Sequence, residues 1–181
     1  MTRLETPAPS GVVGAPPPGR VAEVLSRTGG LAVLHDRRLR PAGGVIDCLA
    51  VAPAGVFVVD APGHEGKVGK RKPGGRRGGD ERLTVDRRDR TALLDGLERK
   101  VAQVAGILGD SGLASVPVFG VLCFVGARWP LFLCRPLRLR GAVALWPEAL
   151  PEHVTGTGSL DSAAMARATD ALARSLAPAS G

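Results

Sequence analysis

The segment VIDCLAVAPAGVFVVDAPGHEGKV, residues 45 to 68, places two aspartates, Asp47 and Asp60, within runs of β-branched and small apolar residues. Such runs are typical of buried strands. Pro53 and Ala54 separate the two runs, and proline is favoured at the second position of a tight turn. The segment therefore predicts a β-hairpin. Because an ionised carboxylate in a buried strand must be paired or bound to a ligand, both aspartates are candidate functional residues.

The register of this hairpin decides whether the two carboxylates meet. With a two-residue loop of Pro53 and Ala54, Asp47 lies directly opposite Asp60, with β-carbons about 5 Å apart. Two like charges at that distance take up a proton or hold a cation between them, and converging carboxylates suit Mg²⁺ or Mn²⁺. If Gly55 instead forms a left-handed bulge, the register moves by one residue and the side chains point to opposite faces. A third interpretation places each aspartate at a strand end, facing water.

Apolar periodicity predicts helices and strands along the rest of the chain. Helices are expected over residues 20–26, 89–108 and after 161, and strands over residues 31–34, 82–85, 117–125 and 131–134. The glycine-rich stretch 63–79 is expected to be a loop, and Asp89 and Asp161 are candidate helix caps. This order of elements predicts an α/β fold in which helices flank a mixed β-sheet.

The composition indicates one globular domain. The chain has 181 residues, of which 44% are hydrophobic, enough for a single core. It divides into a Pro- and Gly-rich disordered tail, one domain and a short second tail, over residues 1–18, 19–177 and 178–181. Neither a signal-peptide pattern nor an apolar stretch of membrane-spanning length is visible, so we expect a cytoplasmic protein without membrane contact. Cys48, Cys123 and Cys134 lack metal-site spacing and are predicted to be small buried hydrophobes.

Positive charge is concentrated between Gly66 and Arg90. The formal net charge is +7 and the pI is about 10.3, and this segment holds ten basic residues against four acids. Such a balance favours an anionic partner such as nucleic acid, although a solvated loop without a ligand is the alternative. The cations predicted to contact phosphates are Lys70, Arg71, Lys72, Arg76 and Arg77. With four Phe, two Trp and no Tyr, the chain offers little for base stacking, so contact with the backbone of duplex DNA is predicted.

Short motifs along the chain follow the order found in one protein family. They are Val33-Leu34-His35-Asp36-Arg37-Arg38, Ile46-Asp47, Gly55-Val56-Phe57-Val58-Val59-Asp60, Gly66-Lys67-Val68 and Asp89-Arg90-Thr91. Together they resemble the nuclease-related domain family, abbreviated NERD, which is similar to the PD-(D/E)xK restriction-endonuclease-like nucleases. The resemblance extends from Arg20 to Ala177. It implies a restriction-endonuclease-like mixed β-sheet flanked by helices and metal-dependent phosphodiester chemistry.

The resemblance also implies which residues form a metal site for Mg²⁺ or Mn²⁺. In that superfamily the site consists of a helix Glu, the Asp of the first hairpin strand, and an acidic-x-Lys on the second strand, whose Lys orients the attacking water. Asp47 matches the first-strand acid and Asp60 the second-strand acid, so both are expected to be catalytic residues and metal ligands. The lysine position holds Pro62, and Pro18 stands where the helix Glu is expected. Lys67 is the candidate replacement for the lysine.

Three hypotheses about function follow. Loss of one charge-stabilising group typically slows such a reaction by about 10²- to 10³-fold, so the first is a nuclease-related domain that binds duplex DNA with impaired catalysis. The second is an active Mg²⁺- or Mn²⁺-dependent DNA nuclease in which Lys67 acts as the substitute lysine and Glu23 supplies a third acid. The third is a non-catalytic protein-interaction domain whose basic segment docks on an acidic protein surface.

Overall fold

A computed structural model of the protein describes residues 11–13, 19–40, 44–71, 81–129 and 135–179. Within these residues the larger of two sheets has eight strands in the order β1-β2-β3-β4-β8-β11-β10, with β12 also paired to β2. Its strands are β1 (Gly11–Val13), β2 (Ala32–Arg38), β3 (Val45–Ala52), β4 (Gly55–Asp60), β8 (Val118–Cys123), β10 (Leu137–Leu139), β11 (Ala142–Leu145) and β12 (Ala177–Pro178). Parallel and antiparallel pairs both occur.

The remaining elements are a second sheet and the helices. The second sheet has the order β7-β6-β5-β9 and consists of β5 (Gly66–Arg71), β6 (Arg82–Val85), β7 (Arg88–Asp89) and β9 (Ala127–Arg128). The helices are α1 (Arg20–Arg27), α2 (Thr91–Asp110), the 3-10 helix η1 (Pro147–Ala149), α3 (Leu150–Val154) and α4 (Ser162–Ser175).

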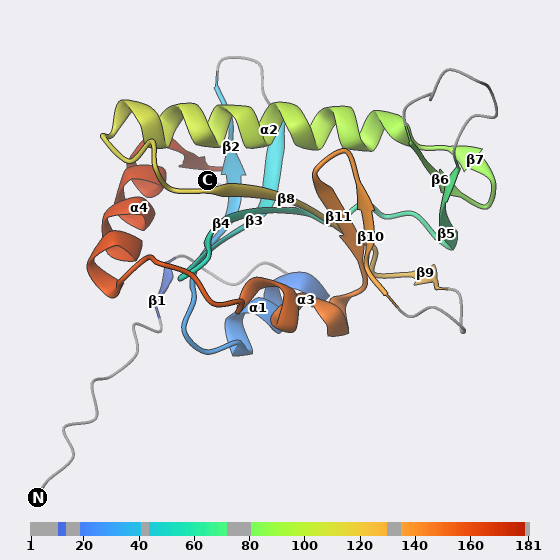
Figure 1. The fold of residues 1–181 in the computed structure, drawn as a ribbon, viewed down its shortest axis with the longest axis horizontal. Coiled ribbons are helices and arrows are strands. Elements are labelled where there is room, and N and C mark those ends of the chain that lie inside the picture. Colours follow the sequence, from blue (N-terminus) through green and yellow to red (C-terminus); the bar gives the residue numbers. More distant parts are fainter. Residues whose placement is uncertain (1–10, 14–18, 41–43, 72–80, 130–134, 180–181) are drawn as a thin grey trace, which may run out of the picture.

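Helices cover both faces of the larger sheet, with α2 and α4 on one side and α1 and α3 on the other (Figure 1). Side chains alternate between two apolar clusters along β3, where Leu49 joins the α2 side and Cys48 the α1 side. The long helix packs closely on β8, because a β-carbon at Gly120 would lie 2.9 Å from Cδ2 of Leu97. This mixed sheet between helical layers confirms the predicted α/β, restriction-endonuclease-like fold.

The β3–β4 hairpin has the register expected from a two-residue turn. Ala52 pairs with Gly55 and the ladder continues to Cys48 and Val59. Gly55 does adopt a positive φ of +142°, and a β-carbon there would lie 2.5 Å from the carbonyl oxygen of Pro117. Glycine is therefore required for close approach to the preceding segment of β8, and the register shift of a bulge does not occur.

The stretch 63–79 was expected to be a loop, but Gly66–Arg71 form strand β5, and residues 72–79 lie outside the described part of the chain. Val68 is fully buried and pairs with Val85 of β6. A β-carbon at Gly66, whose φ is +118°, would lie 2.3 Å from Oδ2 of Asp86. For residues 66–71 the expectation of a loop was wrong, because these glycines allow close packing of a strand that has a single apolar residue.

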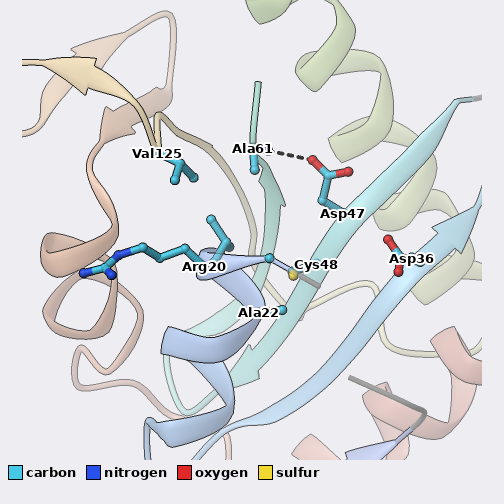
Figure 2. Close-up of a pocket in the computed structure, with 9 residues that line it drawn as sticks. Arg20, Ala22, Asp36, Asp47, Cys48, Ala61 and Val125 are labelled. Atoms are coloured by element: carbon cyan, nitrogen blue, oxygen red, sulfur yellow. Dashed lines mark hydrogen bonds between the residues drawn. The ribbon is translucent and has the colours of Figure 1, made fainter. Parts of the chain in front are cut away.

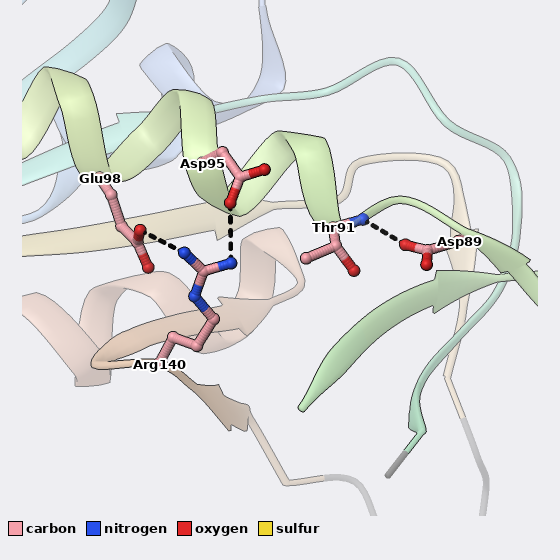
Figure 3. Close-up of polar contacts among 5 residues, drawn as sticks. All are labelled: Asp89, Thr91, Asp95, Glu98 and Arg140. Carbon is pink, nitrogen blue, oxygen red and sulfur yellow. Dashed lines mark hydrogen bonds and ion pairs between the residues drawn. The ribbon is translucent and has the colours of Figure 1, made fainter. Parts of the chain in front are cut away.

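The region after Leu139 contains an element for which the sequence analysis made no prediction. A hairpin of β10 and β11 turns at Arg140 and Gly141, both with positive φ, which is typical of a two-residue turn of type I′. The Arg140 guanidinium donates to Asp95 Oδ1 at 2.7 Å and to Glu98 Oε2 at 2.6 Å, which fastens the hairpin to α2 (Figure 3). The hairpin is thus a specific part of the fold that the sequence reading missed.

The two predicted caps have different outcomes. Asp161 is the N-cap of α4 and accepts a hydrogen bond from Ala164 N, as predicted. Asp89 ends β7 and its Oδ1 accepts from Thr91 N at 2.9 Å, but the N-cap of α2 is Arg90 (Figure 3). The cap assignment of Asp89 was therefore wrong by one residue.

The division into a tail over residues 1–18, a domain over 19–177 and a second tail over 178–181 stays a prediction. Strand β1 falls within the segment 1–18 that was expected to be a tail, and residues 1–10, 14–18 and 180–181 lie outside the described part of the chain. The expected strand 131–134 also lies outside it, and β8 pairs with β4 and β11. No helix among the described residues is long and apolar enough to cross a membrane.

Candidate functional site

The candidate site begins where the β3–β4 ladder ends. Its last pair is Cys48 and Val59, so Asp47 and Asp60 follow as opposite neighbours on the two strands. Both side chains are partly buried. The hairpin therefore brings the two acids of the sequence prediction to the same end of adjacent strands.

The two carboxylates make different contacts. Oδ2 of Asp47 accepts a hydrogen bond from Ala61 N at 2.7 Å, within the hairpin (Figure 2). Oδ2 of Asp60 accepts a hydrogen bond from Nζ of Lys100 on α2 at 2.6 Å. The same Nζ donates to the carbonyl oxygen of Val45, also at 2.6 Å. Oδ1 of Asp60 is buried and has no hydrogen-bond partner among the described residues. The charge of Asp60 is thus met by a lysine from the helical layer.

The environment of Asp60 acts on its ionisation in opposite directions. Burial, the largest effect, raises the pKa of Asp60, and the hydrogen bond and charge of Lys100 lower it. The carboxylate of Asp47 raises the pKa of Asp60 further, as expected of a like charge nearby. Asp60 and Lys100 are 15% and 19% exposed, so the ion pair lies in a region where charge is costly unless compensated.

A cavity of about 310 Å³ opens on the α1 side of the hairpin (Figure 2). It is lined by the start of α1 and by Asp36, Asp47, Cys48, Ala61 and Val125. Burial raises the pKa of the Cys48 thiol far above its usual range, so this cysteine lines the cavity as an uncharged thiol. Asp60 is not one of the lining residues. The cavity therefore contains one of the two predicted acids.

The residues present do not fit the complete metal site of the superfamily. The described part of the chain contains no group of three or more His, Cys, Asp or Glu placed to hold an ion. Glu23, the candidate third acid, is exposed on α1 and forms an ion pair with Arg27 at 2.9 Å. Pro62 is half-buried and offers only its carbonyl, which accepts from His64 N. A cation at this site would find two carboxylates, Asp47 and Asp60, each of which already accepts a hydrogen bond.

The predicted lysine substitute and two of the five predicted phosphate contacts lie on the second sheet. Lys67 is an exposed residue of β5, where its backbone N–H donates to Asp86 Oδ1 at 2.7 Å. Lys70 forms an ion pair with Glu81 at 3.1 Å, and Arg71 is exposed. The other three predicted contacts, Lys72, Arg76 and Arg77, lie outside the described residues.

Lys100 is the site residue that sequence reasoning missed, although a signal was present. It lies three residues after Leu97 and four before Val104, both buried on the apolar stripe of α2. Helix positions with that spacing share one face. A lysine on a buried face needs a partner for its charge, and the hairpin carboxylates were the available candidates.

Comparison with known families agrees with this arrangement. A family model described as Nuclease-related domain matches residues 15–125, which include α1, the hairpin with both acids, β5 to β7, α2 and β8. No curated protein and no solved structure matches the chain. The matched residues are more than half of the 181 in the sequence, and the chain therefore belongs to the nuclease-related domain family.

Proposed function

We propose that this nuclease-related protein binds the backbone of duplex nucleic acid and that its hydrolysis of phosphodiesters is impaired. The single observation that carries the proposal is the ion pair of Asp60 with Lys100 at 2.6 Å, beside a proline in the place of the motif lysine. In the superfamily pattern the second-strand acid is free to hold a metal ion and the lysine next to it serves the attacking water. Here the acid is bound by a lysine and the motif position has neither charge nor donor.

Positive charge on the second sheet supports binding. Strands β5 and β6 together carry four exposed lysines or arginines, which are Lys67, Lys70, Arg71 and Arg82. Cations that neutralise phosphates release condensed counter-ions and give an affinity that falls steeply with salt. The scarcity of aromatic residues favours a duplex over single strands, because base stacking dominates single-strand binding. The cytoplasmic location expected from the sequence stays a prediction.

The test is a binding and cleavage experiment on the same preparation. Fluorescence anisotropy with a labelled duplex of about 20 base pairs is expected to show binding at about 50 mM salt that weakens strongly by about 200 mM. Plasmid DNA incubated with Mg²⁺ or Mn²⁺ is expected to stay supercoiled. Absence of duplex binding at low salt would contradict the proposal and favour the interaction-domain hypothesis.

An active nuclease is the second candidate, favoured by the position of Lys100 beside the second-strand acid. Lys100 would then provide from the helix the positive charge that position 62 lacks. This candidate predicts cleavage in Mn²⁺ that is lost in Asp60→Asn and in Lys100→Met. Loss of cleavage in Lys67→Met, with Lys100→Met unaffected, would instead support the lysine substitute predicted from the sequence.

A further inference from the structure

The second sheet has one apolar face and one face that carries cations. Val68, Leu83 and Val85 are buried in the same cluster that packs against α2, so these side chains define the inner face. Lys67 and Arg71 on β5 alternate with Val68 and therefore lie on the opposite face. We call this opposite side of β5, β6 and β9 the outer face.

Cations on the outer face stand directly opposite one another in neighbouring strands. Arg71 pairs with Arg82 in the antiparallel β5–β6 ladder, and Lys67 pairs with Arg128 in the parallel β5–β9 ladder. All four are exposed. Like charges directly opposite in a sheet destabilise it. Two such pairs on one small sheet are unfavourable unless anions compensate for them.

The acids on this sheet compensate only part of the charge. Asp89 forms an ion pair with Arg82 at 2.8 Å. Asp86 lies 3.7 Å from Arg128, and its Oδ1 also accepts the backbone N–H of Lys67. Within the described residues no ion pair involves the side chains of Lys67 or Arg71. The outer face thus holds four cations and two acids, and one cation of each opposed pair is left for an external anion.

The spacing of these cations suits a row of phosphates. Lys67 and Arg71 are four strand residues apart, about 13 Å at the usual rise of a β-strand. Partners across the sheet are about 5 Å apart. A strand of B-DNA carries one phosphate per about 3.4 Å of helix axis, so the two cation pairs match phosphates about four nucleotides apart. A flat row of point charges of this kind contacts the backbone without reading bases.

We propose that the outer face of the second sheet, through Lys67, Arg71, Arg82 and Arg128, is the surface that binds the phosphates of duplex nucleic acid. The inference rests on the proposed function and adds the surface to it. It also assigns Lys67 to phosphate contact, where the sequence predicted a catalytic role.

The experiment measures how the affinity for a labelled duplex depends on salt. Each phosphate contact adds about 0.9 to the slope of log affinity against log salt. Arg71→Gln and Lys67→Gln are therefore each expected to lower that slope by about 0.9 and the affinity by about eightfold at 0.1 M salt. The matched control is Arg167→Gln, which removes one exposed charge from α4 at the far end of the larger sheet (Figure 1), and it is expected to bind as the parent does.

The outcomes separate the surface from the function. If the parent binds duplex and both glutamine variants keep its slope, the surface assignment is overturned and the proposed function stands. If the parent does not bind duplex at low salt, the proposed function fails, and the surface with it. If the glutamine variants lose affinity for poly-glutamate by the same factor as for the duplex, the outer face binds anions in general and the duplex assignment is overturned. Because each variant removes a like-charge repulsion, its melting temperature is expected to be no lower than that of the parent, and circular dichroism checks this.

Discussion

Replacement of Lys100 by Met tests whether the ion pair at the end of the hairpin is part of the folded structure. The methionine keeps the apolar stem of the lysine and removes its ammonium, so Asp60 is left buried and unpaired. Removing one partner of a buried pair costs about 3–5 kcal/mol. Since the two side chains are 15% and 19% exposed, we expect a loss at the low end, about 3 kcal/mol at pH 7.

The pH dependence of this loss identifies its cause. Burial raises the pKa of Asp60 in the folded protein, and Lys100 opposes that rise. A raised carboxyl pKa means that the folded state binds the proton more tightly, so the stability from this group is present below the unfolded pKa and falls as the pH rises through the folded one. Without Lys100 the pKa rises further. The destabilisation is therefore expected to be smaller at about pH 4 than at pH 7, because more of the Asp60 carboxyl is neutral at the lower pH.

Urea denaturation of three variants at both pH values makes the measurement. Arg99→Met removes an exposed charge from the neighbouring position of α2 and is expected to change stability by less than about 0.5 kcal/mol. The double variant Asp60→Asn/Lys100→Met is expected to lose at least about 1 kcal/mol less stability than the sum of the losses of its two single variants. A Lys100→Met loss within about 0.5 kcal/mol of the Arg99→Met loss at pH 7 would refute the reasoning.

Two further predictions concern packing and the cysteines. Gly120→Ala forces a β-carbon against α2 side chains and is expected to lower the free energy of unfolding by about 1–3 kcal/mol. Gly106→Ala, on the open side of α2, is expected to raise it by about 0.5–1 kcal/mol. Thermal melts compare the two variants, and equal effects would count against the close approach of α2 to β8. Burial raises the pKa of Cys123 to about 12 and that of Cys48 still higher. In a Cys134→Ser variant both thiols are therefore expected to resist a disulfide reagent at pH 8 until urea unfolds the chain, and reaction within minutes in the native state would contradict their burial.

Local signals in the sequence were enough to predict the central hairpin and the helices α1, α2 and α4. The turn at Pro53 and Ala54 fixed the register, and Asp161 marked the start of α4. These features depend on residues close together in the chain. A turn type or a cap needs no knowledge of the tertiary structure, so such elements are visible without it.

Elements stabilised by distant contacts were harder to predict. Strand β5 has one fully buried side chain, Val68, and its other positions are glycines or cations. The β10–β11 hairpin is fastened to α2 by Arg140, whose partners lie more than 40 residues away. In both cases the stabilising contacts come from other elements, which override weak local preference.

The site was predicted in part for the same reason. Asp47 and Asp60 were found because an acid in an apolar strand is conspicuous and because the hairpin register relates them. Lys100 comes from another layer of the fold, 40 residues along the chain from Asp60. Its place on the apolar stripe of α2 indicated that it needed a partner, but only the packing of α2 on the sheet identified that partner.

The location of the lysine bears on which of the two candidate functions is correct. A lysine two residues beyond the acid on the same strand would stand beside the carboxylate and leave both free to act on a phosphate. Lys100 instead donates to Asp60 and to the carbonyl of Val45, both at 2.6 Å, so a phosphate must compete with two short hydrogen bonds for its charge. If that charge is committed to folding, Lys100→Met loses much stability and the protein has little cleavage activity to lose. If the ammonium is available for chemistry, the same variant loses little stability and nearly all cleavage, so one substitution measured in two assays separates a binding protein from a nuclease.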